Sequence, residues 1–359
     1  MKYELGTLLK TMVEQGASDL HLSVGSPPAY RINGQIVRAK TPPMAPEDTK
    51  AICYALVTDS QKKQFEVEHE LDFAFGFKGL ARLRANFFVQ RGSVAAVFRR
   101  IESEVRPLDQ LGLSRHVQGL VDRPSGLVLI TGATGSGKST TLAAMIDKIN
   151  RTSRYHIVTI EDPIEYTHSH KMSLVNQREI GTDCKSFAGA LRAVLREDPD
   201  VIMVGEMRDR ETAEAALKAA ETGHLVFSTL HTNGAIATIN RILQLFPLDS
   251  QEYVRSLLAF TLEGIVTQAL VQRADKRGRI LVYEYLTNTP AIRTLIRENK
   301  LHQAYGQMQL AQETHGMVTL NQGLAQHVAA GTITSAEALS HSPDPDELAR
   351  MFDKLGGRR

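Results

Sequence analysis

The chain has 359 residues, of which 42% are apolar and 23% are charged, and its formal net charge is only +2. This length and composition predict a globular protein of two or three domains, and the scattered Lys and Arg residues argue against a dedicated nucleic-acid surface. The two cysteines, Cys53 and Cys184, form no C-x-x-C pair, which excludes a zinc knuckle and a disulfide framework.

Residues 1–101 predict a domain of mixed helices and strands. Leu5, Leu8, Leu9, Met12 and Val13 have helical spacing, which predicts an opening amphipathic helix. Two short alternating segments follow, the second with Asn33-Gly34 as a hairpin signal. A small sheet with helices on one face is expected. The predicted strands cover 19–24, 29–37, 71–77 and 81–99, the last paired about 91–93, and further helices cover 47–57 and 59–65.

The remainder of the chain changes pattern. Residues 102–124 contain two prolines and two glycines and are predicted to be a linker. Over 125–289, short apolar runs alternate with helical stretches, which predicts a parallel sheet with helices on both faces. Residues 290–359 are predicted to be helical only. Strands are expected at 127–131, 156–160, 201–204, 225–230 and 279–286, and helices at 139–149, 187–196, 211–222 and 251–272.

No run approaches the roughly 18 apolar residues of a membrane span. Glu4 and Glu14 interrupt the N-terminal segment, which is therefore not expected to be a secretory signal. We expect a cytoplasmic protein that reaches a membrane only through a partner.

The segment from Gly132 to Ser139 matches the P-loop pattern G-x-x-x-x-G-K-[ST]. A predicted buried strand precedes it and a predicted helix follows, as this motif requires. Backbone N–H groups of such a loop face phosphate oxygens, Lys138 reaches the outer phosphates, and the Ser139 hydroxyl can bind Mg²⁺. We therefore expect ATP and Mg²⁺, with nucleotide contacts from Gly132, Thr134, Gly135, Ser136, Gly137, Lys138, Ser139 and Thr140.

Hydrolysis also needs a carboxylate that orients the attacking water. Two candidates follow predicted strands: Glu161 with Asp162, and Glu206. Many P-loop ATPases carry an Asp at the position that Gly205 occupies here, so the acid is displaced by one residue. Glu161 or Asp162 can then share the metal and the water. The alternative is that these acidic residues are merely solvated residues at the ends of strands and have no catalytic role.

His224 and His231 flank the apolar run 225–230. An imidazole at the end of the strand that faces the phosphates can hydrogen-bond the γ-phosphate. The spacing alone leaves open whether either histidine does so or whether both are surface residues at the rims of the strand. Metal binding is disfavoured because no partner His or Cys has ligand spacing.

Several segments together resemble the motifs of secretion ATPases. GATGSGKS at 132–139, TIEDPIEY at 159–166, REDPDVIMVGEMRD at 196–209 and ETGHLVFSTLHT at 221–232 resemble the P-loop, Asp box, modified Walker B and His box. VNQREIG at 175–181, ASDLHL at 17–22, ARLRANFF at 81–88 and AIRTLIRE at 291–298 extend this likeness over nearly the whole chain. The pattern is most similar to the PilT/PilU group of type IV pilus retraction ATPases.

The resemblance implies an N-terminal PAS-like domain, a RecA-like P-loop core and a helical C-terminal tail. It also implies a homohexamer that binds ATP between the N-terminal domain of one subunit and the core of its neighbour. Glu206 would be the catalytic carboxylate, Glu161 would support the water or the metal, and His231 would contact the nucleotide region. His224 is a further candidate for nucleotide contact.

Arginines of the N-terminal domain would act across the subunit interface, and Arg82, Arg84 and Arg99 match that role best. Phosphoryl transfer needs positive charge from outside the cradle, which arginine usually supplies. The alternative is that these three are ordinary charges on a strand face.

Too few cysteines for a zinc insert and a short N-terminal region favour pilus retraction over pilus assembly. Residues 316–357 look more like the accessory paralogue of the group than the primary motor, which leaves that choice open. The resemblance implies an inner-membrane platform protein as partner, the pilus filament as an indirect one, and a possible paralogous retraction ATPase. Other readings are a secretion or conjugation ATPase, a regulatory ring member with little turnover, or a DNA translocase, which the near-neutral charge disfavours.

Overall fold

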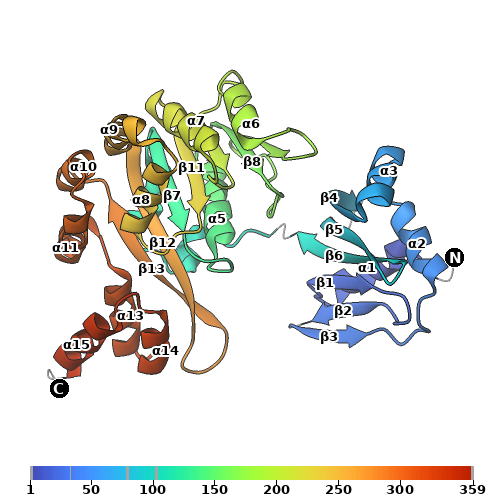
Figure 1. Cartoon of the computed structure of the whole chain (residues 1–359). Helices are drawn as coiled ribbons and strands as arrows, with labels where there is room; N and C mark the ends of the chain where they lie inside the picture. Colours follow the sequence, from blue (N-terminus) through green and yellow to red (C-terminus); the bar gives the residue numbers. More distant parts are fainter. Residues whose placement is uncertain (1–2, 33, 78–80, 102–103, 357–359) are drawn as a thin grey trace. The chain divides into compact units, whose positions relative to one another are not determined.

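The computed structural model describes residues 3–32, 34–77, 81–101 and 104–356 (Figure 1). These residues form two compact units. One consists mainly of Met1–Glu104, and the other consists of Val105–Ile164 and His168–Arg359.

The first unit is built on an antiparallel six-stranded sheet with the order β3-β2-β1-β6-β5-β4. Its strands lie close to the predicted ranges, while Asn33 of the predicted hairpin turn lies outside the described residues. Strands are β1 (Asp19–Leu22), β2 (Ala29–Ile32), β3 (Gln35–Arg38), β4 (Glu70–Phe77), β5 (Ala81–Gln90) and β6 (Ser93–Ile101), and helices are α1 (Leu5–Glu14), α2 (Pro46–Tyr54) and α3 (Asp59–Glu68).

The two faces of this sheet differ because side chains alternate along each strand. On one face Leu20, Leu83, Phe87 and Phe98 are buried against residues of the three helices. The opposite face carries charged residues, among them Asp19 and Arg99, which are directly opposite each other on β1 and β6. The predicted small sheet with helices on one face is confirmed.

The segment that the sequence predicts as a linker is largely part of the second unit. Its short helices are η1 (Leu108–Leu111), α4 (Arg115–Gln118) and η2 (Gly119–Asp122). Val117 and Leu120 are fully buried in the same cluster as Val128 and Met145 of the core. Residues 105–122 therefore pack on the core sheet and do not form a free connection.

The second unit is built on a seven-stranded sheet with the order β13-β12-β7-β11-β10-β8-β9. All neighbouring strands are parallel except β12 and β13. Strands are β7 (Gly126–Thr131), β8 (His156–Glu161), β9 (Leu174–Glu179), β10 (Val201–Val204), β11 (Leu225–Leu230), β12 (Leu262–Gln272) and β13 (Arg279–Thr287), and the helices among them are α5 (Lys138–Thr152), α6 (Phe187–Val194), α7 (Arg210–Glu221), α8 (Ala235–Gln244), η3 (Leu248–Ser250) and α9 (Gln251–Thr261).

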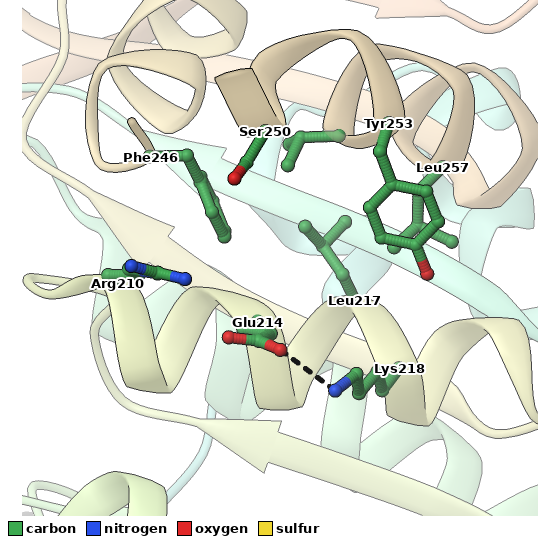
Figure 2. A pocket seen from close by; sticks show the side chains of 9 residues that line it. Arg210, Glu214, Leu217, Lys218, Phe246, Ser250, Tyr253 and Leu257 are labelled. Atoms are coloured by element: carbon green, nitrogen blue, oxygen red, sulfur yellow. Dashed lines mark hydrogen bonds and ion pairs between the residues drawn. The ribbon is translucent and has the colours of Figure 1, made fainter. Parts of the chain in front are cut away.

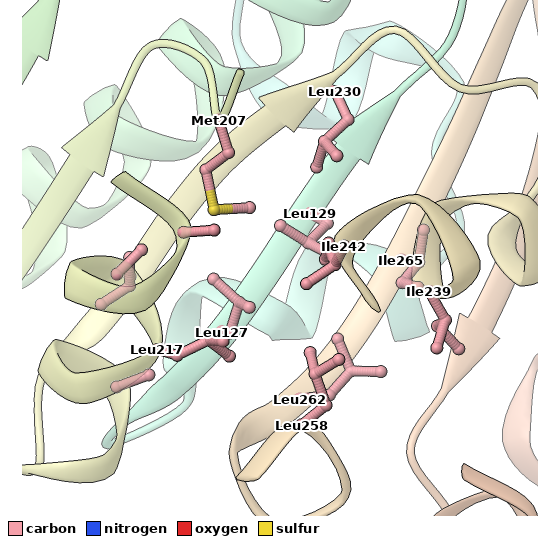
Figure 3. Packing of buried hydrophobic residues seen from close by; sticks show 14 of the residues in the cluster. Leu127, Leu129, Met207, Leu217, Leu230, Ile239, Ile242, Leu258, Leu262 and Ile265 are labelled. Carbon is pink, nitrogen blue, oxygen red and sulfur yellow. The ribbon is translucent and has the colours of Figure 1, made fainter. Parts of the chain in front are cut away.

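Helices cover both faces of this sheet, so its central strands are buried throughout. Leu127 and Leu129 of β7 pack toward α7, α8 and α9 (Figure 3), whereas Val128 and Ile130 pack toward α5. Burial on both faces explains why these strands read as continuous apolar runs.

The predicted helix over 251–272 is wrong in its second half. Helix α9 ends at Thr261, and Leu262 begins β12, which pairs with β7 on one side and β13 on the other. Gly264 fits there because an added Cβ would lie 3.1 Å from Leu120 and 3.2 Å from Tyr285. The sequence prediction also omitted strand β9 and helix α8.

The C-terminal region is helical, as predicted. Its second half packs on the β12–β13 hairpin, where Leu324, Ala338 and Leu348 share a cluster with Val271 and Val282. Within the described residues, no helix combines the length and the apolar character that crossing a membrane requires. The helices are α10 (Pro290–Arg297), η4 (Leu301–Gln303), α11 (Ala304–Leu310), α12 (Gln312–His315), α13 (Leu320–Ala329), α14 (Ser335–His341) and α15 (Pro345–Gly356).

Candidate nucleotide site

One edge of the core sheet gathers most of the predicted site. Because β7, β11, β10 and β8 are parallel, their carboxyl ends lie along the same edge. The P-loop follows β7, Glu161 ends β8, Glu206 follows β10, and His231 follows β11. Four segments that are distant in sequence thus bring their polar residues to one edge.

The P-loop connects β7 to helix α5, which begins at Lys138. Gly132 has a φ of +135°, and an added Cβ would lie 2.4 Å from the backbone oxygen of Gln268. Only glycine therefore fits the start of the loop. The buried Lys138 Nζ donates hydrogen bonds to the backbone oxygens of Gly132 (2.8 Å) and Ala133 (3.0 Å). Lys138 thus folds back over the loop, and Ser139 and Thr140 lie in the first turn of α5.

Glu161 is a buried carboxylate with a fixed orientation. The Thr159 hydroxyl donates to Glu161 Oε1 at 2.6 Å, and Gln177 Nε2 of β9 donates to the same oxygen at 3.0 Å. The prediction assigned no role to Thr159 or Gln177. The available signal was that both are polar residues inside segments that form strands.

Glu206 and His231 come together, although 25 positions separate them in the sequence. His231 Nε2 lies 3.5 Å from Glu206 Oε2, and Arg208 Nε lies 2.8 Å from the same oxygen. The Glu206 side chain is 18% exposed. A carboxylate in this position keeps access to water while its orientation is restricted by two neighbours.

The structure does not place His224 at this edge. Leu225, the next residue, is directly opposite Gly126 at the start of β7, and the His224 backbone oxygen accepts from Gly126 N. The His224 ring lies 2.9 Å from the Ala219 backbone oxygen at the end of α7. Strand β11 separates it from the P-loop edge by roughly 20 Å at about 3.3 Å per residue. The structure therefore places His224 at the opposite end of β11 from the P-loop, apart from the other predicted site residues of the core.

The three predicted arginines lie on the charged face of the first unit. Arg84 is directly opposite Arg99 on the paired strands β5 and β6, and Arg82 is two residues along β5. Arg99 Nε donates to Asp19 Oδ1 at 2.8 Å, and Arg84 Nε lies 3.5 Å from Asp72 Oδ1. The Arg84 and Arg99 side chains are nonetheless 43% and 67% exposed.

The ion pair also affects Asp19. Burial of its carboxylate acts to raise its pKa, but hydrogen bonds from Ser18 and Arg99 and the charge of Arg99 bring the pKa below its ordinary value. Asp19 therefore stays charged and holds Arg99 in place. The structure brings the three arginines together, and each position remains compatible with an ordinary strand-face charge.

A separate surface pocket of about 100 Å³ lies between α7 and α9 (Figure 2). Phe246, Leu217 and Leu257 form its apolar wall, and the Glu214–Lys218 ion pair lies at its side. None of its lining residues belongs to the P-loop edge, so the pocket is not part of the candidate nucleotide site.

Comparison with known proteins identifies relatives that are named as ATPases or as secretion system proteins. A family model described as "Type II/IV secretion system protein" matches residues 3–340. A Pseudomonas aeruginosa relative named "Type IV pilus retractation ATPase PilT" is 47% identical over 345 residues, covering 96% of this chain and 100% of the relative. A second relative from this organism, "Type IV pilus ATPase PilU", is 42% identical over 353 residues, covering 98% and 92%.

Two solved structures are similar to this chain over most of its length. The crystal structure of the pilus retraction motor PilT with bound ADP has a TM-score of 0.92 and 53% identity, covering 97% of this chain and 99% of that one. The Legionella pneumophila ATPase DotB has a TM-score of 0.82 at 26% identity, with 93% of each chain covered.

Proposed function

Because the chain belongs to the type II/IV secretion system protein family and is a PilT-type ATPase within it, we propose that it is a motor that hydrolyses ATP to retract a type IV pilus. The observation that carries the proposal is its similarity, over 96% of its length, to a relative named as a pilus retraction ATPase. The gathering of the P-loop, Glu161, Glu206 and His231 at one sheet edge supports the same chemistry.

In this proposal the P-loop cradles the phosphates and Lys138 balances the charge of the outer ones. Glu206 orients the attacking water, and its contact with His231 links that carboxylate to the end of β11. Glu161, held by Thr159 and Gln177, supports the water or the metal.

Mg²⁺ fits the residues that are present. Among the described residues, no three His, Cys, Asp or Glu side chains form a metal cluster. Mg²⁺ commonly binds through one or two protein oxygens together with substrate phosphates. The Ser139 hydroxyl and the Glu161 carboxylate are such a set of donors. When bound, the ion would neutralise charge that develops on the phosphates.

We further propose that the active form is a homohexamer in which Arg82, Arg84 or Arg99 reaches ATP bound by the neighbouring subunit. The exposed arginine pair on β5 and β6 supports this role, since a guanidinium can stabilise transferring phosphate from outside the cradle. The ring would work at the cytoplasmic side of the inner membrane through a platform protein.

The identity of 47% with the PilT relative exceeds the 42% with the PilU relative. This difference favours the primary motor over the accessory paralogue, although the tail at 316–357 resembles the latter at the level of sequence.

Two measurements test the proposal. The purified protein should hydrolyse ATP in a steady-state assay, and a deletion strain should carry long pili that do not retract and should lose twitching motility. Expression of the wild-type chain should restore motility, whereas a Glu206→Gln chain should not. Normal retraction in the deletion strain would remove the pilus role, and an inactive purified hexamer would remove the motor role.

A further inference from the structure

The segment 231–235 connects the end of β11 to helix α8 and carries His231. Four threonine hydroxyl groups form a row beside it, and three of the four residues, Thr131, Thr238 and Thr267, are buried. Thr232 Oγ1 lies 2.6 Å from Thr238 Oγ1, and Thr131 Oγ1 lies 2.7 Å from Thr267 Oγ1. Thr238 Oγ1 lies 3.5 Å from Thr131 Oγ1, so the two pairs are neighbours. The row thus extends from β12, through the last residue of β7, to the residue after His231.

Thr238 lies at the centre of this row and is completely buried. Its hydroxyl donates to the backbone oxygen of Gly234 at 2.7 Å, which leaves its oxygen to accept from Thr232. One side chain therefore fixes two points of the segment 231–235. Its neighbour in the row, Thr131, directly precedes Gly132, the first residue of the P-loop.

Glu284 fixes the same segment from the other side. Helix α8 has Gly234 at its N-cap, which has no side chain to satisfy the free N–H groups. Glu284 Oε1 on β13 accepts from Ala235 N at 2.7 Å and so takes the place of the missing cap. Its other oxygen accepts from Leu320 N at 3.3 Å, at the start of α13.

This carboxylate is held between two helix N-termini, whose partial positive charges favour it. Burial raises the pKa of Glu284, and its two backbone hydrogen bonds oppose that rise. Burying a carboxylate in a strand costs free energy of folding unless its oxygens accept hydrogen bonds. Its position is explained by the two helix starts that it joins.

We propose that Thr238 and Glu284 are positioning residues for ATP hydrolysis, which fix the segment 231–235 so that His231 stays at the Glu206 carboxylate. The inference rests on the proposed ATPase activity. His231 Nε2 is already 3.5 Å from Glu206 Oε2, so a small movement of the segment breaks that contact. A misplacement of about 1 Å can reduce a rate by roughly 10²-fold. Binding by the P-loop is expected to change little, because its own backbone contacts remain.

The first test is a matched set at Thr238. Thr238→Val keeps the shape and removes the hydroxyl, and Thr238→Ser keeps the hydroxyl. Thr261→Val is the control, because Thr261 is equally buried and donates to the backbone oxygen four residues earlier, but lies before β12 at the opposite edge of the sheet. Steady-state ATPase measurements on verified hexamers should give kcat and KM for each protein, with thermal melting as a check of folding.

We expect Thr238→Val to lower kcat by roughly 10-fold to 10²-fold with KM changed less than about 3-fold. Thr238→Ser should stay within about 3-fold of wild type in kcat, and Thr261→Val should behave likewise. An equal loss in Thr238→Val and Thr261→Val, or in Thr238→Val and Thr238→Ser, would overturn the role of the hydroxyl.

Glu284→Gln tests the second residue. The amide keeps the shape but presents an NH₂ group to one of the two backbone N–H donors. We expect a selective fall in kcat of roughly 10-fold or more. A wild-type kcat in this variant would overturn the role of Glu284. An inactive wild-type protein would instead count against the proposed function, so the two failures are distinguishable.

Discussion

The two sheets of this protein present their polar residues in different ways. In the core, both faces of a mainly parallel sheet are covered by helices, and polar residues gather where the strands end. In the first unit, helices cover one face of an antiparallel sheet, and arginines and aspartates occupy the other. In this protein the parallel sheet thus presents polar residues at the edge where its strands end, whereas the antiparallel sheet presents them over its uncovered face. Changes at the core edge should alter turnover with little loss of stability, and changes on the charged face should alter stability or action on a neighbour.

Lys138→Ala should give the largest effect at the core edge. Loss of the cation that meets the outer phosphates should abolish detectable hydrolysis and weaken ATP binding. A ligand at 100 times its Kd stabilises the folded state by about 2.7 kcal/mol, so thermal melting with and without ATP measures the loss. A melting shift equal to that of the wild type would show that the backbone cradle is sufficient for binding.

Arg84→Ala tests the charged face. If Arg84 acts on ATP of the adjacent subunit, the variant alone should lose roughly 10³-fold or more in rate while its own P-loop is intact. Mixed hexamers with Lys138→Ala should regain part of the activity, because some interfaces then pair an intact core with an intact first unit. Full activity of Arg84→Ala alone would refute this role. Mixed rings as inactive as either parent would indicate action within one subunit or strictly sequential firing.

Glu206→Gln should separate binding from turnover at the core edge. The amide keeps the shape and removes the charge that orients water, so the rate should fall by roughly 10²–10³ while ATP still raises the melting temperature. Glu161→Gln is the parallel variant. Hydrolysis near the wild-type rate by Glu206→Gln would transfer the catalytic role to Glu161.

Asp19→Asn should have the smallest effect, and it should act chiefly on the stability of the first unit. It replaces a buried carboxylate that pairs with Arg99, and we expect a loss of about 1–2 kcal/mol in the free energy of unfolding. The folded-state pKa of Asp19 is lowered, so its contribution is fully present above its ordinary value of 3.8 and is lost as the pH falls below it. Denaturant unfolding followed by hydrogen exchange in β1 and β6, at pH 7 and at low pH, measures this. A lower turnover with unchanged stability would instead indicate that Asp19 acts mainly by positioning Arg99.

The sequence predicted the central strands because they are buried on both faces and therefore consist mainly of apolar residues. The same property caused the error at 251–272. Strand β12 is largely buried and follows helix α9 without a break, so its apolar residues continue the helical spacing. The junction depends on Asn288, whose Nδ2 donates to the backbone oxygens of Ala259 and Leu262, and this contact is not visible in local sequence.

For the site, motif spacing predicted the P-loop, Glu161 and Glu206, because each lies at the end of a predicted strand, and the family resemblance added His231. It could not separate His224 from His231, since only the direction of β11 in the sheet distinguishes them. Thr238 and Glu284 were missed, although each interrupts an apolar pattern. The sequence shows a Thr on the buried side of α8 and an acid within the apolar run of β13. It does not show which groups these two side chains contact, so their roles could not be predicted.

The strand before the P-loop is the first strand of the core sheet in sequence, yet it lies between β11 and β12, which come late. Thr131 meets Thr267, which is 136 residues further along the chain. At about 5–20 residues per second of synthesis, roughly 7–27 s pass before that neighbour exists. On the ribosome, the first unit can complete its sheet during this interval while the strand that leads into the P-loop still lacks its neighbours. A nascent chain therefore completes the sheet on both sides of this strand only after roughly three quarters of the chain has been synthesised.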